Sequence, residues 1–419
     1  MVNKRRLLVN SVFLASLILL LNCAEPDGKL GGSVINPEVT GEVRDSLFYP
    51  VTAGAYGNFQ SPSGTSLHLY LGKGEEYEAR FLVKFDNFYN LPDSFDFVSA
   101  EMVLYGGAIY GDSTVSYPDF EGYIYKDPEL VYSNNWNEYW VTWDSLYYPS
   151  GTLKDTFIVS KWRGDSIVVP IDTNWIRDWI DEYEWSADTT TWDTIAPVNS
   201  GLLFDFNPSA EFIKDFHSSE NADSIKPRLV CHLTVYDTSG VVSSDSVMVI
   251  YASNDIYIAK DNALLPGDRL YIGRSDGYRG MLLMDPSTVL PQFGVFINRA
   301  TFTFFIDTAS VFYTGALGNI TADRMTDTLW ISNPAEYNID ATYQGSLAYI
   351  SGDSVTLSIT NMLFDWVIHP DENFGMSLRF DQEGVDLTRA PIFPHDCPDL
   401  TKRPYVYVVY TTAEGAGDE

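Results

Sequence analysis

The chain has 419 residues, of which 45% are hydrophobic and 15% aromatic, and its formal net charge at pH 7 is −31. A charge of this size repels nucleic acid and anionic lipid headgroups, so neither is expected as a partner. The apolar content excludes a disordered acidic tail and allows the chain to bury cores of its own. The acidity therefore serves solubility, tolerance of divalent cations or the binding of a neutral ligand.

The first 22 residues have the three-part layout of a secretory signal. A basic cluster, Lys4-Arg5-Arg6, precedes an apolar stretch from Leu7 to Leu21, and Cys23 follows closely. The apolar stretch is shorter than the about 20 residues that a membrane-spanning helix needs, so a transmembrane anchor is the weaker interpretation. Residues 1–22 are therefore predicted to be a removable signal peptide.

The residues Leu20-Leu21-Asn22-Cys23 resemble the lipobox of bacterial lipoproteins, in which the cysteine is diacylated and the signal is cut before it. The lipobox usually has Gly, Ala or Ser where Asn22 stands, and the alternative is a plain secretory signal with an unrelated cysteine. The resemblance implies a lipid on Cys23 and durable attachment to a membrane. By analogy with enteric bacteria, Ala24 favours the outer membrane of the cell envelope, on its periplasmic or surface side.

Residues 23–42 are rich in Gly, Pro, Asn and charge, and we predict that they tether the lipid to the first domain. Two further cysteines remain, Cys231 in a strand-like run and Cys397 in a loop bracketed by prolines. Export would permit a disulfide between them. We expect both to be unpaired, so that stability comes from packed cores.

Beyond residue 42, short runs rich in Val, Ile, Tyr, Phe, Trp and Thr recur between Gly, Pro, Asn and Asp clusters, which is typical of an all-β sandwich or barrel. Polar and apolar residues alternate over 66–71 and 165–171, as in strands with one buried face. Helical periodicity is confined to residues 174–183 and 361–368, where we expect one or two turns after a strand.

The two halves of the chain carry the same ordered landmarks. An Arg-led apolar run ends in Asp six positions later in both halves, at Arg80 to Asp86 and at Arg279 to Asp285, and a Leu-Pro pair begins five positions further on. The remaining landmarks are the pairs Leu69–Lys73 and Leu270–Arg274, Asp178-Trp179 and Asp365-Trp366, Ser200–Phe204 and Phe374–Leu378, and Lys226–Val230 and Lys402–Val406. The chain is therefore predicted to be a tandem duplication.

The predicted boundaries follow from these landmarks. Domain one is expected over residues 43–238 and domain two over 246–412, with a linker at 239–245 and an acidic tail at 413–419. Because the linker is short, the two domains are expected to be close neighbours with limited freedom.

Domain one resembles the DNRLRE-type domain, a secreted β-sandwich related to carbohydrate-binding modules. The matching residues, in family order, are Gly72, Arg80 to Asp86, Leu91-Pro92, Val98-Ser99-Ala100, Trp136-Asn137-Glu138, Val141-Thr142-Trp143, Gly201-Leu202, Phe216 to Glu220 and Pro227-Arg228-Leu229. The resemblance implies tandem jelly-roll-like antiparallel β-sandwich domains and, for some family members, polysaccharide binding. Domain two keeps only part of the pattern and has no Trp-x-Glu segment followed by Val-Thr-Trp.

Aromatic side chains are the most suggestive binding residues, because an exposed ring offers a flat apolar platform to a sugar face. Trp140, on the strand face opposite Trp143, and Trp192, in a loop rich in Thr and Asp, are the candidates for exposed ligand-binding rings. Trp136, Trp143 and Trp179 are expected in the core instead. The Arg80–Asp86 and Arg279–Asp285 pairs are expected to be separate structural hydrogen-bonders rather than a ligand clamp.

No catalytic residues are predicted. The sequence lacks a Gly-x-Ser-x-Gly elbow, a His-Glu-x-x-His helix and a phosphate-binding glycine loop, and its 57 carboxylates single out no acid and base pair. Its 5 histidines show no metal spacing, and His395-Asp396-Cys397 is expected to be an inert loop. Asp371-Glu372-Asn373 and residues 255–261 would supply oxygen ligands to a structural Ca²⁺, but solvated turns without any cofactor are preferred.

The leading hypothesis is a non-catalytic envelope lipoprotein whose paired sandwiches bind polysaccharide or a neighbouring envelope component. The first alternative is a structural spacer or assembly protein that binds no small ligand. The second is a divergent carbohydrate-active enzyme, which a groove with convergent carboxylates would favour.

Overall fold

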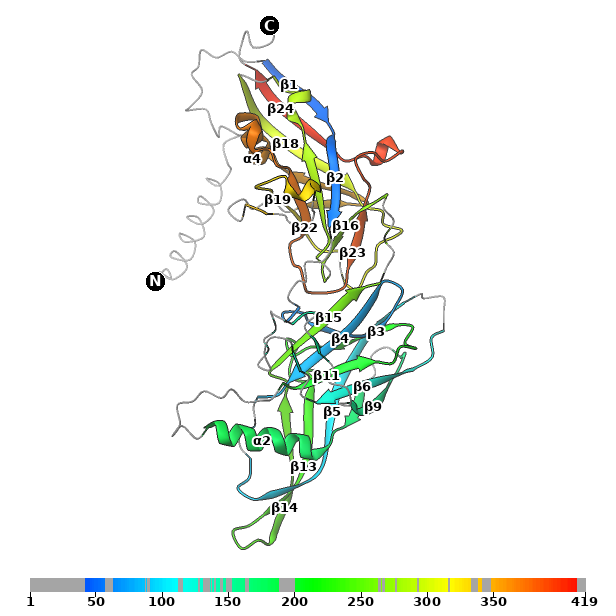
Figure 1. Cartoon of the computed structure of the whole chain (residues 1–419), viewed down its shortest axis with the longest axis vertical. Helices are drawn as coiled ribbons and strands as arrows, with labels where there is room; N and C mark the ends of the chain where they lie inside the picture. The colour runs from blue at the N-terminus through cyan, green and yellow to red at the C-terminus, as the bar shows by residue number, and fades with distance from the viewer. Residues whose placement is uncertain are drawn as a thin grey trace, which may run out of the picture.

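The computed structural model describes residues 42–412 except for gaps at 57–62, 87, 89–90, 112–115, 127–128, 131–135, 137, 139–140, 144–145, 148–152, 163–165, 188–199, 263–264, 266–267, 276, 292–293, 316, 333–337 and 341–347. Antiparallel sheets form two sandwiches that lie end to end (Figure 1). The predicted all-β class with two antiparallel sandwiches is therefore confirmed. Among the described residues, no helix has both the length and the apolarity needed to cross a bilayer.

The second sandwich contains two facing sheets and a short third one. The strand order of one sheet is β1 (Glu42–Phe48), β24 (Tyr405–Thr412), β18 (Val295–Phe305), β21 (Ser354–Ser358), β20 (Tyr349–Ser351). The order of the other is β19 (Ile320–Arg324), β22 (Met376–Phe380), β17 (Arg279–Met284), β2 (Pro50–Tyr56). The short sheet pairs β16 (Leu270–Gly273) with β23 (Arg389–Ile392).

The first sandwich is one continuous sheet folded on itself. Its strand order is β14 (Val242–Tyr251), β13 (Arg228–Tyr236), β5 (Phe95–Tyr110), β12 (Ile213–His217), β3 (His68–Lys73), β4 (Tyr77–Lys84), β11 (Leu202–Phe206), β6 (Phe120–Lys126), β9 (Leu153–Val159). In addition, β10 (Ser166–Pro170) pairs with β5 and β15 (Asn254–Asp261) with β4. The 16-residue strand β5 takes part in both layers, which is why the sheet does not divide.

Strand pairing repeats between the sandwiches, which supports the predicted duplication. The seven pairs β24–β1, β24–β18, β18–β21, β17–β2, β17–β22, β22–β19 and β16–β23 of the second sandwich have the counterparts β13–β14, β13–β5, β5–β10, β4–β15, β4–β11, β11–β6 and β3–β12 in the first. The landmark residues therefore occupy equivalent places in two copies of one fold.

The two repeats exchange their first two strands. β1 and β2 precede the first sandwich in sequence, yet they pair with β24 and β17 of the second. Conversely, β14 and β15 follow β13 in sequence and complete the first sandwich. Strand pairing thus crosses the predicted boundaries at 43–238 and 246–412.

The expected linker at residues 239–245 also needs correction. Gly240, with a φ of 79°, donates from its backbone N–H to Asp237, and Val242–Asp245 already lie in β14. The segment is therefore the turn and first part of a β-hairpin. The segment was predicted to be a linker because it lies between the two sets of landmarks, and nothing in the sequence shows that its backbone groups pair with β13.

Helices close one side of each core. α2 (Thr173–Ala187) buries Trp175, Ile176, Trp179 and Ile180, and the equivalent α4 (Thr360–Ile368) buries Met362, Leu363 and Trp366. Both expected helices are therefore present, although α2 has 15 residues and exceeds the one or two turns predicted. The described chain also contains β7 (Glu129–Leu130), β8 (Leu146–Tyr147), α3 (Leu329–Ser332) and the 3₁₀ turns η2 (Pro286–Thr288), η3 (Pro370–Glu372) and η4 (Leu400–Lys402).

The predicted core residues have different outcomes. Trp136 and Trp179 are buried as expected, whereas Trp143 is half-buried and lies 3.9 Å beneath the Arg80 guanidinium. Cys231 and Cys397 are both buried and unpaired, which confirms that prediction.

Trp330 takes the place of Trp136 in the second sandwich. Trp136 donates its indole N–H to the carbonyl of Ser200 at 2.8 Å, and Trp330 donates to the equivalent carbonyl of Phe374 at 2.9 Å. The second repeat therefore keeps this tryptophan in α3, although it lacks the surrounding Trp-x-Glu sequence.

Candidate binding site between the sandwiches

The predicted site residues Cys23, Trp140 and Trp192 all lie outside the described residues. An aromatic that the sequence analysis did not single out, Trp162, is 65% exposed after β9. The backbone carbonyl of Trp162 accepts a hydrogen bond from the buried Lys214 ammonium, which fixes the loop that carries the ring. The sequence analysis missed Trp162 because this residue lies outside the clusters of aromatic residues.

The repeated Arg and Asp pairs act separately, as expected. Arg80 lies 2.9 Å from Asp205, whereas Asp86 accepts a hydrogen bond from Ser253. Arg279 instead forms a two-pronged ion pair with Glu383, at 2.8 and 2.6 Å. Neither pair forms a ligand clamp.

The two sandwiches are joined by a dense contact that centres on Arg389 of β23. Its guanidinium is buried, forms ion pairs with Glu76 and with Asp261 of the first sandwich, and stacks 4.9 Å from the Tyr77 ring. Burial lowers the pKa of Arg389 to about 10, so the side chain stays charged at neutral pH. Leu387 of the second sandwich packs into the core of the first.

A polar pocket of about 560 Å³ opens beside this contact, and we call it the inter-sandwich pocket. Thr65, Leu67 and His68 enter it from the start of β3. Thr314 and Gly315 follow β18, and the remaining lining comes from the loop after β22, with Asp381, Gln382, Glu383, Val385 and Asp386. Ligand sites often form at such junctions between units.

Arginines and backbone groups hold the 381–386 loop. Arg279 binds Glu383, and the buried Arg274 lies 2.5 Å from Asp386. Across the junction, Tyr257 donates its hydroxyl to the carbonyl of Gly384 at 3.0 Å, and Ser66 donates to that of Val385 at 2.7 Å. The loop is therefore fixed from both sandwiches, and its carboxylates are oriented before any ligand arrives.

A buried polar network supports the pocket from the first sandwich. His68 lies 3.3 Å from the buried Asp215, which also contacts the Tyr110 hydroxyl at 3.1 Å. The Tyr110 hydroxyl reaches the carbonyl of Thr314 at 2.9 Å, so the network crosses to the second sandwich. Burial lowers the pKa of the neighbouring His217, and His68 adds to the shift, which favours a neutral His217.

Glu138 and Ser219, from two of the segments that resemble the DNRLRE-type domain, both contact Asp255. The Asp255 carboxylate accepts the backbone N–H of Ser219 at 2.5 Å, while Glu138 accepts the backbone N–H of Asp255 at 3.2 Å. Burial raises the pKa of Asp255 to about 8, and the nearby Glu138 and Glu220 contribute. Burial also raises the pKa of Glu138. Asp255 is therefore largely protonated at neutral pH.

The pocket offers hydrogen-bond acceptors more than reactive groups. Carboxylate oxygens accept hydrogen bonds, so this lining suits hydroxyl and amide donors of a ligand. The described part of the chain contains no group of three or more His, Cys, Asp and Glu residues that could hold a metal ion. Residues 255–261, considered for Ca²⁺ and expected to be a solvated turn, lie in strand β15 with Asp255 buried, so that expectation was wrong. Neither they nor Asp371-Glu372-Asn373 form such a group among the described residues.

No known family model matches the chain, and no curated protein matches it either.

The sequence did not identify the pocket lining, because Glu383 and Asp386 follow an ordinary strand and are two among 57 acidic residues. Their significance depends on Arg274 and Arg279, which are more than one hundred positions away. The only sequence feature that pointed to this region was Arg279, which repeats Arg80 of the first half.

Proposed function

We propose that this chain is a non-catalytic cell-envelope lipoprotein that binds polysaccharide in the inter-sandwich pocket. The observation that carries the proposal is the pocket wall of oriented carboxylates, Glu383 and Asp386, each bound by a guanidinium. Sugar hydroxyls donate hydrogen bonds to such acceptors, and bonds to a charged acceptor contribute about 1.5–3 kcal/mol each. The net charge of −31 favours a neutral glycan over an anionic one.

Binding without catalysis fits the placement of these carboxylates. Glycoside cleavage needs one protonated carboxylic acid and one carboxylate on opposite sides of the scissile bond. Glu383 and Asp386 both belong to the 381–386 loop and each is held by its own arginine, so they line one wall of the pocket and not two opposing walls.

Retention on a panel of soluble and insoluble polysaccharides tests the proposal. We expect Asp381→Ala and His68→Ala to weaken retention at least tenfold, because both line the pocket without forming the core. Trp162→Ala is the matched control, since this exposed ring lies outside the pocket lining. If only Trp140→Ala abolished retention, the glycan site would move to the aromatic loop. If the wild-type chain bound no glycan, the proposal would fail.

Attachment to the membrane is tested separately by labelling with a palmitate analogue. The proposal rests on Cys23 and its resemblance to a lipobox residue. Wild-type protein should take up label and partition with membranes, and Cys23→Ser should do neither. A Cys23→Ser variant that still took up label would contradict the lipoprotein assignment.

A structural spacer is the second candidate, and the contact around Arg389 favours it. Two sandwiches joined by a buried arginine with two ion pairs would act as a stiff unit. In that case the wild-type chain would retain no polysaccharide, and Arg389→Ala would loosen the junction between the two sandwiches.

A further inference from the structure

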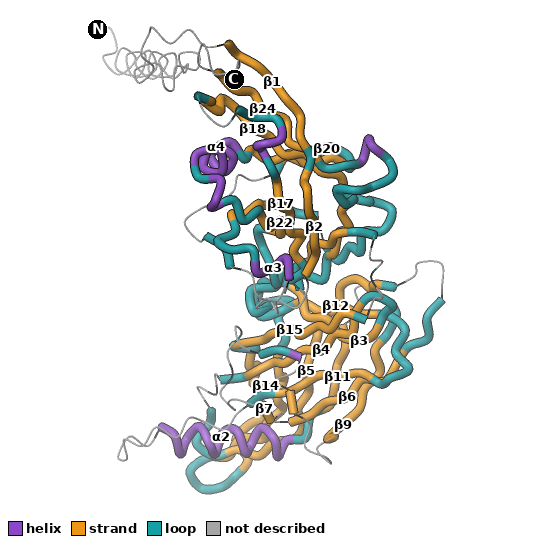
Figure 2. Tube along the Cα trace, turned by 45° about the horizontal axis from the view of Figure 1, so that its top comes forward, coloured by secondary structure: helices purple, strands orange, loops and turns teal. Residues whose placement is uncertain are grey.

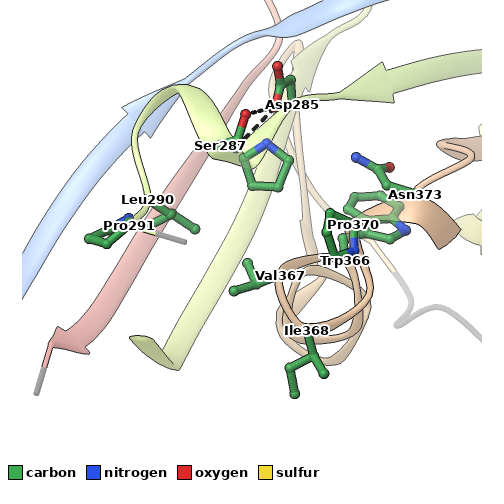
Figure 3. Close-up of a pocket in the computed structure, with 10 residues that line it drawn as sticks. Asp285, Ser287, Leu290, Pro291, Trp366, Val367, Ile368, Pro370 and Asn373 are labelled. Atoms are coloured by element: carbon green, nitrogen blue, oxygen red, sulfur yellow. Dashed lines mark hydrogen bonds between the residues drawn. The ribbon is translucent and has the colours of Figure 1, made fainter. Parts of the chain in front are cut away.

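Two further features of the described chain are a cavity in the second sandwich and the edge strand β14. The cavity has a volume of about 460 Å³ and lies between η2 and α4 (Figure 3). Its lining carboxylate, Asp285, already accepts hydrogen bonds from the backbone N–H and the hydroxyl of Ser287, and two other lining residues, Trp366 and Pro286, are buried. The edge of β14 differs, because its backbone groups are open.

The outer edge of β14 carries backbone groups that point away from the sheet. β14 is the last strand of its sheet, and β13 is its only neighbour among the described strands. Ala252 donates its backbone N–H to the carbonyl of Pro227, just before β13. Because backbone groups alternate along a strand, the N–H and C=O groups of the odd-numbered residues from 245 to 251 point away from β13. An edge of this kind accepts a further strand.

The side chains of β14 leave this edge unprotected. Val247, Val249 and Tyr251 are 56%, 44% and 37% exposed on the solvent face. Asp245 is the one charged residue among the ten of the strand. The equivalent strand β1 has three charged residues in seven, Glu42, Arg44 and Asp45. Charges on an edge strand oppose pairing with another chain, so β1 is protected and β14 is not.

The molecule already joins its two repeats by strand addition. β14 belongs to the second repeat in sequence and completes a sheet of the first, and β1 does the converse. Sheets of this fold therefore accept strands from another copy of the same repeat. A strand from a second copy of the chain is a partner of the same chemistry.

β14 is also complementary to itself. When a two-fold axis passes through Met248, Val247 lies opposite Val249 of the second copy, and Asp245 lies opposite Tyr251. In this antiparallel register every outward backbone group meets another outward group. The two Asp245 carboxylates lie six positions apart along the strands, about 20 Å at about 3.4 Å per residue, so solvent and salt screen their repulsion.

We propose that two copies of the chain associate edge to edge through β14, as a two-fold symmetric dimer in this register. The pairing gives partners to the open backbone groups and covers the exposed valines. β14 lies at the opposite end of the molecule from β1, so the dimer leaves the N-terminal strand of each copy free (Figure 1). The dimer is independent of the inter-sandwich pocket and of the glycan proposal.

Analytical ultracentrifugation of the mature chain carrying Cys23→Ser tests the association without a lipid. The dimer fraction should rise between about 1 and 100 µM, because a single pair of strands is a small interface. Val249→Lys should weaken the association at least tenfold, because it brings two like charges within two positions of each other at the new strand pair. Leu47→Lys on the exposed face of β1 is the matched control and should leave the association unchanged.

Val247→Pro tests the backbone pairing itself. The N–H of Val247 points away from β13, so proline removes only an outward donor and keeps the pairing within the sheet. The variant should therefore keep a melting temperature within a few degrees of wild type and lose the dimer.

Met248→Cys tests the register. The two copies of residue 248 would form a pair without hydrogen bonds, with Cα atoms about 4.5 Å apart, which is within the range of a disulfide. Mild oxidation should give a covalent dimer of Met248→Cys and none of Leu47→Cys, while the buried Cys231 and Cys397 stay unreactive. A wild-type monomer at every concentration, unchanged association of Val249→Lys and Val247→Pro, or equal cross-linking of the two cysteine variants would overturn the proposal.

Discussion

Asp255 shows how one buried carboxyl makes stability depend on pH. Its pKa is raised to about 8, mainly by burial, from an ordinary value of 3.8. Between these two pKa values the folded chain keeps a proton on Asp255 that the unfolded chain loses. The contribution of Asp255 to the free energy of unfolding is therefore fully present below about pH 4. Between pH 4 and 8 the contribution falls with rising pH, by at most about 1.4 kcal/mol per pH unit.

We expect Asp255→Asn to remove this dependence. The amide keeps an oxygen acceptor for the Ser219 N–H but carries no titrating proton. Urea unfolding at pH 5 and pH 8 should therefore show that the variant becomes more stable relative to wild type as the pH rises.

Asp237→Asn is the control, because Asp237 is exposed and its pKa is lowered by hydrogen bonds from Ser239 and Val241. Its effect should be the same at both pH values. Parallel pH dependence of Asp255→Asn and wild type would disprove the assignment.

Single residues were predictable where their role is local. Trp136 and Trp179 were assigned to the core and are buried there, and Arg80 and Asp86 were assigned to separate structural roles from their spacing along one strand. Asp255 was not, because it sits in an acidic stretch and only the fold covers it. Its counterpart in the second sandwich is Ala53, so the repeat gives no hint either.

Among the strands, the exchange of β1 and β2 makes each sandwich depend on the other repeat. Phe48 of β1 is 3% exposed and belongs to the core of the second sandwich, which follows it by more than two hundred residues. Neighbouring Leu47 is 50% exposed on the opposite face of the same strand.

This pair provides a test of the exchange. Phe48→Ala should lower the free energy of unfolding of the second sandwich by about 3–5 kcal/mol, because it leaves a cavity in that core. Leu47→Ala should change stability by only about 0.5 kcal/mol.

Hydrogen exchange identifies which sandwich opens. In Phe48→Ala, amides of β17 and β24 should exchange faster while those of β4 and β13 stay protected. Faster exchange confined to β4 and β13 would mean that β1 belongs to its own repeat after all.

The duplication was predictable and the exchange was not. Spacing from Arg80 to Pro92 matches that from Arg279 to Pro291 because the same strand and turn recur. β1 and β14, by contrast, read Glu-Val-Arg-Asp-Ser-Leu-Phe and Val-Ser-Ser-Asp-Ser-Val-Met-Val-Ile-Tyr, and share only an Asp-Ser pair followed by apolar residues. Which repeat such a strand joins depends on the direction of the chain between β2 and β3, and local sequence does not encode that direction.

At the scale of the molecule, the exchange decides which sandwich would face the membrane. β1 begins at the end of the second sandwich that lies away from the junction, while the β13–β14 hairpin forms the opposite end of the molecule (Figures 1 and 2). A lipid on Cys23, joined to Glu42 by a short tether, would therefore hold the second sandwich close to the bilayer. The first sandwich, although earlier in sequence, would point away from it.

A fluorophore and a lipid-headgroup quencher test this orientation on lipidated protein in vesicles. A label at Arg44→Cys in β1 should be quenched several times more strongly than one at Ser243→Cys in β14. Both positions are exposed, so labelling should leave the fold intact. Equal quenching, or stronger quenching at residue 243, would exclude the orientation.

The same path of the chain has a mechanical consequence. Before the chain reaches the first sandwich, β1 and β2 run the length of the second sandwich, and the backbone then continues towards β3 (Figure 1). If Cys23 carries a lipid as proposed, a force on the first sandwich would reach that lipid as tension in the covalent backbone, without passing through the ion pairs at the junction. The second sandwich would surround the strands that carry this tension. The hydrogen bonds from β1 to β24 and from β2 to β17 would together resist the straightening of β1 and β2.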